Sequence, residues 1–190
     1  EDIAKIAREK VIFFHTDAAQ SLGKIPVDVE RLGVDLLTIA GHKLYAPKGI
    51  GALYMRKGTP FTPLIHGSGQ ENNHRAGTEN VAFIVALGKA CDLLKEKLEK
   101  KENLRLAKLR DKLWQSLCEK LEVVRFGHSK HCLPNTLFVG FKGLNGWEVL
   151  KKVPEICAST GAACQSGKAG ISNILLALGV APSVAKGAVR

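Results

Sequence analysis

Two ionisable residues, each placed directly after a short apolar run, are the clearest candidates for chemistry in this sequence. Asp17 follows the run at residues 11–16, and Lys43 lies just beyond the run at residues 36–40. A lysine beside apolar and glycine-rich segments can be desolvated, and its neutral amine can then form a Schiff base with a carbonyl group. Lys43 alone would fit an ordinary surface lysine. A carboxylate that pairs with a pyridine nitrogen, together with a Schiff-base lysine, is typical of pyridoxal phosphate sites.

Short buried strands separated by turns are the elements expected around these residues. Residues 11–16, 36–40 and 50–55 are apolar runs of strand length. Strands that are apolar throughout are typical of parallel sheets covered on both faces. Strands joined by helical or loop connections favour an α/β layered architecture. Residues 1–83 are therefore predicted to be part of a large α/β domain with a mostly parallel sheet.

The remaining residues, 84–190, are predicted to form a small α+β domain that is truncated at its C-terminus. Apolar residues recur with a helical period from Val81 to Leu98, and the pattern resumes at Leu106. One long helix, or two nearly collinear helices, should lead into this domain. Further strands are expected at residues 135–141 and 156–160, and further helices at 146–153, 171–178 and 183–190, the last capped by Ser183.

Composition and charge narrow the class of protein. Of the 190 residues, 45% are hydrophobic and 24% are charged, which suits a folded core. The sequence begins without an initiator methionine, so a fragment of a longer protein is expected. The net charge of +10 raises the question of nucleic-acid or acidic-membrane binding. Acidic residues are interleaved with the basic ones at residues 95–112, so a solvated helix face is predicted instead, with neither nucleic acid nor membrane as a partner.

The five cysteines show no spacing typical of metal ligation, so no metal site is expected. An odd number of cysteines fits free thiols in a reducing compartment. The predicted location is therefore the cytoplasm, or an organelle if a targeting segment precedes residue 1. Cys91 and Cys118 lie in helical apolar patterns and are predicted to be core residues.

Several motifs give the sequence a specific resemblance to a known family. DAAQ at residues 17–20, AGHK at 40–43 and PKGIGALY at 47–54 are followed by HGSGQEN, RAGTEN and TGAACQS. The chain resembles the class V aminotransferase-like group of pyridoxal-phosphate enzymes. Within that group it is most similar to the cysteine desulfurases and the related selenocysteine lyases. The resemblance covers essentially the whole chain and implies a fold-type-I transferase-like structure.

The resemblance implies a set of cofactor-binding residues. Lys43 would carry pyridoxal 5'-phosphate as a Schiff base and act in catalysis, Asp17 would bond the pyridine nitrogen, and Gln20 would contact the ring oxygen. His42 would help to hold the phosphate. Thr78 would reach the phosphate of the cofactor in the other subunit, which implies a homodimer with composite active sites.

The resemblance also implies the substrate and the reaction. Cys164 matches the nucleophilic cysteine that takes up sulfur as a persulfide, and Arg190 matches the arginine that binds the substrate carboxylate. The implied enzyme removes sulfur from L-cysteine, leaves L-alanine, and passes the sulfur to an acceptor or iron–sulfur scaffold protein. At Ala40 many desulfurases carry a serine that donates to the phosphate, and this chain lacks that donor.

Two alternatives remain open from the sequence. The first is a selenocysteine lyase, which would act on L-selenocysteine and release selenide together with L-alanine. The second is a non-catalytic dimerisation or scaffold fragment. The family's ring-stacking residue and main phosphate-binding loop would lie upstream of residue 1, so this 190-residue piece alone is expected to be inactive.

Overall fold

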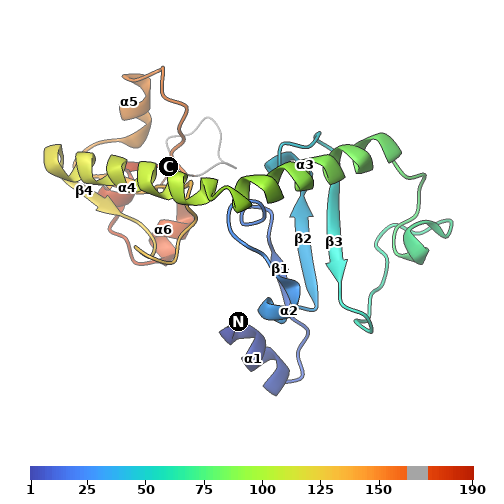
Figure 1. The fold of residues 1–190 in the computed structure, drawn as a ribbon. Helices are drawn as coiled ribbons and strands as arrows, with labels where there is room; N and C mark the ends of the chain where they lie inside the picture. Colours follow the sequence, from blue (N-terminus) through green and yellow to red (C-terminus); the bar gives the residue numbers. More distant parts are fainter. Residues whose placement is uncertain (162–170) are drawn as a thin grey trace. The chain divides into compact units, whose positions relative to one another are not determined.

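The chain forms two compact units, Glu1–Asn103 and Leu104–Arg190, in a computed structural model that describes residues 1–161 and 171–190 (Figure 1). Each unit contains a three-stranded sheet. Cys164 lies outside the described residues. The units divide after Asn103, whereas the sequence analysis placed the domain boundary after residue 83.

The sheet of unit 1 has the strand order β1–β2–β3. Strand β1 (His15–Asp17) is parallel to β2 (Leu36–Ala40), and β2 is antiparallel to β3 (Gly51–Met55). In the described residues the sheet thus contains both parallel and antiparallel pairs. The antiparallel pair arises because the connection from β2 to β3 is too short for a parallel crossover. Strand β2 has the predicted bounds. Strand β1 is shorter than predicted, because Val11 has a φ of 55° and is exposed.

The core of unit 1 lies on one face of this sheet. Successive side chains of a strand point to opposite faces. Ala18, Val34 and Leu37 form the buried cluster, and the short helix α2 (Val29–Leu32) packs against it. Asp17 is exposed and lies on the opposite face from Leu37. The alternation of side chains along the strands thus places the core on one face of the sheet and Asp17 on the other.

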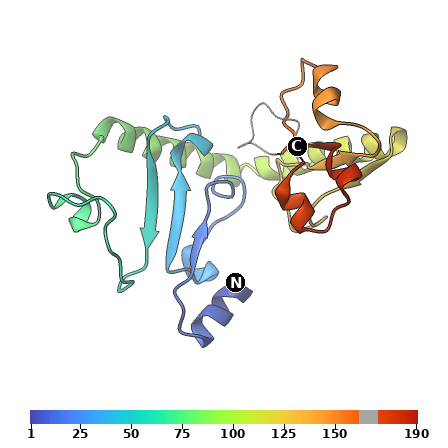
Figure 2. The same ribbon diagram turned by 180° about the vertical axis from the view of Figure 1, so that it is seen from behind.

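Helix α1 (Asp2–Glu9) precedes the sheet, and helix α3 (Val81–Glu99) follows it within unit 1. Ala90 and Leu94 of α3 are buried. A Cβ atom added at Gly23 would lie 2.7 Å from Leu94 Cδ1, so the helix packs closely on the turn after β1. Figures 1 and 2 show α3 running along the end of the sheet at which β2 finishes. This packing explains why the units divide later than predicted.

Unit 2 combines an antiparallel sheet with helices, as the predicted α+β architecture requires. Its strands, in sheet order, are β4 (Val123–Arg125), β5 (Val139–Phe141) and β6 (Ala188–Val189). Its helices are α4 (Glu102–Lys120), which starts two residues before the unit boundary, α5 (Gly146–Lys151), α6 (Asn173–Ala177) and α7 (Pro182–Ala185). Leu175, Ala185 and Ala188 form its buried cluster.

Two predictions near the C-terminus were wrong. The predicted helix at 183–190 is α7 followed by β6, and the helix cap is Ala181, because Pro182 occupies the first turn. The predicted strand at 156–160 is not a regular strand. Ser159 nevertheless exchanges both backbone hydrogen bonds with Arg190, at 3.0 and 2.6 Å.

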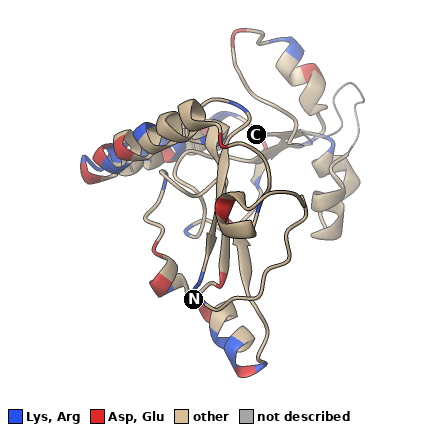
Figure 3. Ribbon diagram, turned by 90° about the vertical axis from the view of Figure 1, so that its right-hand side faces the viewer, with Lys and Arg blue, Asp and Glu red and all other residues tan. Residues whose placement is uncertain are grey.

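Helices α3 and α4 expose most of their length to solvent. From residue 89 onward, basic and acidic residues are interleaved along the two helices, and both colours appear on them in Figure 3, which supports the prediction of a solvated helix face at residues 95–112. Cys91 and Cys118 are exposed, so the prediction that they lie in the core was wrong. Within residues 1–161 and 171–190, none of the helices has the length and apolar character needed to cross a membrane.

Candidate active site

The structure brings Asp17 and Lys43 to the same edge of the unit 1 sheet. Asp17 is the last residue of β1 and is the register partner of Thr38 on β2. Lys43 ends the short helix η1 (Gly41–Lys43), which follows β2 directly. The carboxyl ends of parallel strands meet at one edge of a sheet, and this edge is where ligands bind in open α/β sheets.

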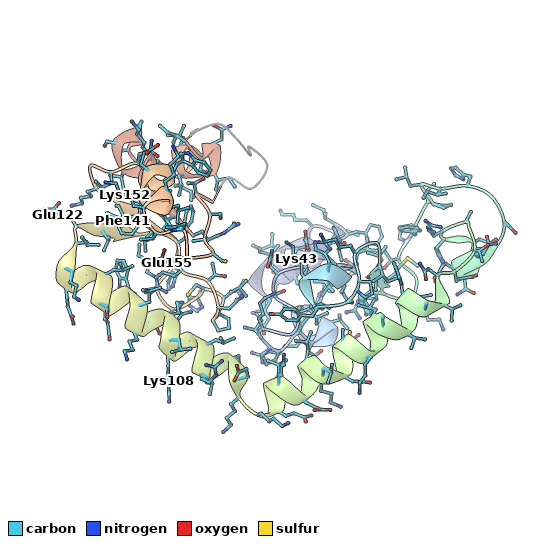
Figure 4. The ribbon with its side chains drawn as sticks, turned by 90° about the horizontal axis from the view of Figure 1, so that it is seen from above. Lys43, Lys108, Glu122, Phe141, Lys152 and Glu155 are labelled. Atoms are coloured by element: carbon cyan, nitrogen blue, oxygen red, sulfur yellow. The ribbon has the colours of Figure 1, made fainter. Side chains whose placement is uncertain are left out.

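The backbone before Lys43 is fixed by close packing. The Gly41 N–H group donates to the Ile50 carbonyl oxygen at 3.0 Å, and the Leu44 and Ala46 N–H groups donate to the Gly41 carbonyl oxygen. The Leu44 side chain is 1% exposed and anchors the turn. The side chain of Lys43 (labelled in Figure 4) is exposed, as is that of the neighbouring His42. The packed backbone of this turn therefore fixes the position from which the exposed amine extends.

Asp17 also starts the turn that carries Gln20. Its Oδ1 accepts a hydrogen bond from the Ala19 N–H group at 2.8 Å, which orients the carboxylate. Gln20 follows in this turn and is exposed. His15 Nε2 and Thr38 Oγ1 lie 2.7 Å apart on the same face as Asp17. His15 is exposed.

Thr38 and Lys24 are polar neighbours of the site that the sequence analysis missed. Thr38 could have been found from strand alternation, because it faces the same side as Asp17 once β1 and β2 are paired. Lys24 lies in a turn in which its own N–H group donates to the Ser21 carbonyl oxygen at 3.0 Å. No sequence pattern marked Lys24, because its position depends on how that turn folds.

Lys24 lies near enough to Lys43 for their charges to interact. Burial lowers the pKa of Lys24 below its ordinary value, and the positive charge of Lys43 lowers it further. Two neighbouring ammonium groups give this edge of the sheet a positive potential. An anionic group such as a phosphate suits that potential.

Thr78 belongs to a separate segment of unit 1. It is exposed and lies in the loop between η2 (Gln70–Asn73) and α3. The Gly77 N–H group donates to Gln70 Oε1 at 3.1 Å, and the Ala76 N–H group donates to the Ile65 carbonyl oxygen at 3.3 Å. The loop is therefore ordered by its own hydrogen bonds. The contact of Thr78 with a second subunit stays a prediction.

Arg190 belongs to unit 2, and its role also stays a prediction. Its side chain is exposed, and its backbone is held by the two hydrogen bonds to Ser159. Ser159 immediately precedes the segment that contains TGAACQS, and Cys164, the predicted nucleophile, falls outside the described residues. In the described part of the chain, no set of three or more His, Cys, Asp and Glu side chains is grouped so that it could hold a metal ion.

The donor set of unit 1 fits pyridoxal 5'-phosphate. An exposed carboxylate and an exposed amine share one sheet edge, as a pyridine nitrogen and an aldehyde of one small molecule require. The neighbouring ammonium group of Lys24 adds the positive charge that a phosphate needs. Asp17, Gln20, His42 and Lys43 are thus the residues of this edge that could hold the cofactor.

Known proteins resemble this chain over essentially its whole length. The family model described as "Aminotransferase class-V" matches residues 1–184. "Cysteine desulfurase IscS" of Dictyoglomus turgidum is 45% identical over the whole chain, which corresponds to 49% of that protein. The structure of a NifS-like protein from Rickettsia africae matches 99% of this chain and 50% of its own, with a TM-score of 0.86 and 30% identity.

A further solved structure, described as "SspA in complex with cysteine", matches all of this chain and 52% of its own, with a TM-score of 0.76 and 34% identity. The similarity to NifS-like structures confirms the predicted fold class. The chain spans about half the length of the relatives that it matches.

Proposed function

The chain belongs to the aminotransferase class-V family, and from this premise we propose that the protein containing it is a pyridoxal-phosphate-dependent cysteine desulfurase. The single observation that carries the proposal is the 45% identity, over the whole chain, to a protein named cysteine desulfurase. The strand-end pair of Asp17 and Lys43 supports the cofactor assignment independently. Residues 1–103 would contribute to the cofactor-binding domain, and residues 104–190 to the smaller domain.

Four residues of unit 1 would hold the cofactor. The amine of Lys43 would be the covalent anchor, and the carboxylate of Asp17 would hold the proton of the pyridine nitrogen. Gln20 and His42 would hydrogen-bond the ring oxygen and the phosphate. Thr78 would reach the phosphate of a second subunit, so a homodimer is part of the proposal. The cofactor, when bound, supplies an electron sink for the substrate's α-carbon.

The sulfur chemistry is assigned to residues of unit 2. Arg190 would bind the substrate carboxylate in a bidentate manner. Cys164 would take the sulfur atom of L-cysteine as a persulfide, and L-alanine would leave. The persulfide would pass to a sulfur-acceptor or iron–sulfur scaffold protein. The released Lys43 amine would move protons between the substrate and solvent as a general base.

A cytoplasmic location is part of the same proposal. All four described cysteines are free, and free thiols persist in reducing compartments. Selenocysteine lyase remains the second candidate, because the same donor set would serve L-selenocysteine. A comparison of initial rates on the two amino acids separates these activities.

The test uses the full-length protein loaded with pyridoxal phosphate. L-cysteine should give L-alanine and a persulfide in equal amounts on the first turnover. Lys43→Ala should lose alanine formation, and Cys164→Ser should lose the persulfide while it keeps the bound cofactor. Lys48→Ala is the matched control, because Lys48 is an exposed lysine of the same connection between β2 and β3. Normal alanine formation by Lys43→Ala, or its loss in Lys48→Ala alone, would refute the assignment.

A further inference from the structure

Unit 2 contains a cluster of one thiol and two guanidinium groups outside the proposed active site. Arg110 Nη1 donates to Cys132 Sγ at 3.2 Å, and Arg125 Nη2 donates to the same sulfur at 3.4 Å. The arginines come from α4 and β4, whereas Cys132 comes from the loop that connects β4 to β5. Three separate segments therefore converge on one sulfur atom.

The two guanidinium groups are almost buried. The side chain of Arg110 is 11% exposed and that of Arg125 is 14% exposed, whereas Cys132 itself is half-buried and reachable from solvent. Positive charges in such surroundings are weakly screened by water and salt. Their effect on the sulfur is therefore stronger than that of surface lysines.

Asp111 is the acidic partner of the cluster. It accepts two hydrogen bonds from Arg110, at 2.8 and 3.0 Å, and lies 3.8 Å from Arg125. The hydrogen bonds to Asp111 raise the pKa of Arg110, and burial opposes this effect. One carboxylate facing two guanidinium groups leaves a net positive charge directed at Cys132 Sγ.

The sulfur also has a hydrogen-bond partner in its own loop. The thiol can donate to the Ser129 carbonyl oxygen at 3.7 Å, but a thiol is a weak donor. The rings of His128 and His131 lie 4.5 Å apart, and His128 Nδ1 accepts two backbone N–H groups of the loop. The loop thus offers the thiol form one weak acceptor, whereas the arginines offer the thiolate form two charged donors.

We propose that Cys132 is a reactive cysteine that undergoes exchange with anionic low-molecular-weight disulfides. The thiolate is the nucleophile in such reactions, and adjacent cations favour it. The same cations attract a reagent that carries carboxylates. This inference does not depend on the cofactor or on the sulfur substrate.

The exchange balances without an added oxidant. Cys132 loses its proton to solvent, and its thiolate attacks one sulfur atom of the disulfide. The bond between the two reagent sulfurs breaks, and a new bond forms between Cys132 Sγ and the attacked sulfur. The second reagent sulfur leaves as a thiolate, so one disulfide is exchanged for another.

The other described cysteines are internal controls. Cys91, Cys118 and Cys157 are exposed, and solvent access alone would make them react before the half-buried Cys132. Charge and access thus predict opposite orders of reaction. The order in which the cysteines are labelled decides between them.

The experiment exposes the full-length protein to dithiobis-nitrobenzoate, a dianionic aromatic disulfide, at neutral pH. Peptide mass spectrometry follows the labelling of each cysteine with time. Cys132 should react about tenfold faster than Cys91, Cys118 or Cys157, since a charge-assisted hydrogen bond contributes about a power of ten to an equilibrium. With neutral hydroxyethyl disulfide, the preference should shrink but remain.

Variants of the cations identify the cause of the preference. Arg125→Gln should slow labelling of Cys132 about tenfold, and Arg125→Lys should restore part of the rate. Lys130→Gln removes a cation of the same loop whose side chain is not among the hydrogen-bond partners of Cys132 Sγ, and it should change the rate less than about twofold. Circular dichroism checks that each variant is folded.

Three outcomes would overturn the proposal. One is labelling of wild-type Cys132 no faster than that of the three exposed cysteines, and this ranking needs no variant. Another is a folded Arg125→Gln protein that labels at the wild-type rate. Equal slowing by Lys130→Gln and Arg125→Gln would also contradict it, because the effect would then be one of general charge.

Discussion

Gly41 offers a sharp test of how the turn positions Lys43. A Cβ atom at this residue would lie 2.6 Å from the Ile50 carbonyl oxygen and 2.8 Å from Ile50 Cγ2. The first distance is about 0.8 Å shorter than an ordinary van der Waals contact of 3.4 Å. The obstructing atom is backbone, so a side-chain rotation cannot relieve the clash. Gly41→Ala must therefore separate the start of η1 from the chain leading into β3.

The expected cost of Gly41→Ala is about 1–3 kcal/mol, the range for overpacked interior sites. The shift should also move Lys43, so uptake of pyridoxal phosphate should fall. Gly88→Ala is the matched control, because a Cβ atom at Gly88 meets no other atom within 4 Å. Gly88 lies inside α3, where alanine should stabilise the helix by about 0.5–1 kcal/mol.

Urea unfolding of the full-length protein and the amount of bound cofactor give the two readouts. The account expects Gly41→Ala to unfold at lower urea and to bind less cofactor, and Gly88→Ala to do neither. If Gly41→Ala matched Gly88→Ala in both measurements, the claim that this contact fixes the lysine turn would be refuted.

Two further predictions concern unit 2. Leu175→Ala should lower the free energy of unfolding in urea by about 2–5 kcal/mol because Leu175 is 1% exposed. Leu178→Ala is the control and should change stability by less than about 0.5 kcal/mol because Leu178 is 69% exposed. Equal effects of the two substitutions would contradict the assigned core. Hydrogen bonds from Arg110 lower the pKa of Asp111 below its ordinary value of 3.8. The ionised Asp111 carboxylate therefore stabilises the folded state fully above pH 3.8, and this stabilisation is lost as the pH falls through the lower pKa of the folded state. Below pH 3.8 the free energy of unfolding of the wild type should fall more steeply with pH than that of Asp111→Asn. The difference should be small because the carboxylate is half exposed. Identical pH dependence of the two free energies in urea unfolding would contradict this prediction.

The sequence predicted the parts of unit 1 that rest on local patterns. The apolar run at residues 36–40 became β2 with the expected bounds, and the two residues chosen for chemistry, Asp17 and Lys43, lie at one sheet edge. Both results follow from short-range information, since a strand's length and the residue after it can be read directly from the sequence. The neighbours Thr38 and Lys24 depend on strand register and turn geometry, which the sequence pattern did not contain.

The main errors arose where tertiary packing decides the structure. The periodicity of α3 predicted a helix, but not that its buried Leu94 would pack on unit 1. Strand β6 has two residues, too few for a periodic signal, so its segment was interpreted as helix. Cys91 follows the helical period of α3 and is nevertheless exposed, so the period alone did not determine which residues are buried.

The most direct test of the proposed function is the position of the covalently held cofactor. The full-length protein, loaded with pyridoxal phosphate, is reduced with borohydride, digested and analysed by peptide mass spectrometry. The account predicts that the cofactor is found on Lys43, that neighbouring Lys24 is unlabelled, and that Lys43→Ala carries no covalent cofactor. Cofactor on Lys24 or on another lysine of the wild-type protein, or none at all, would contradict the account.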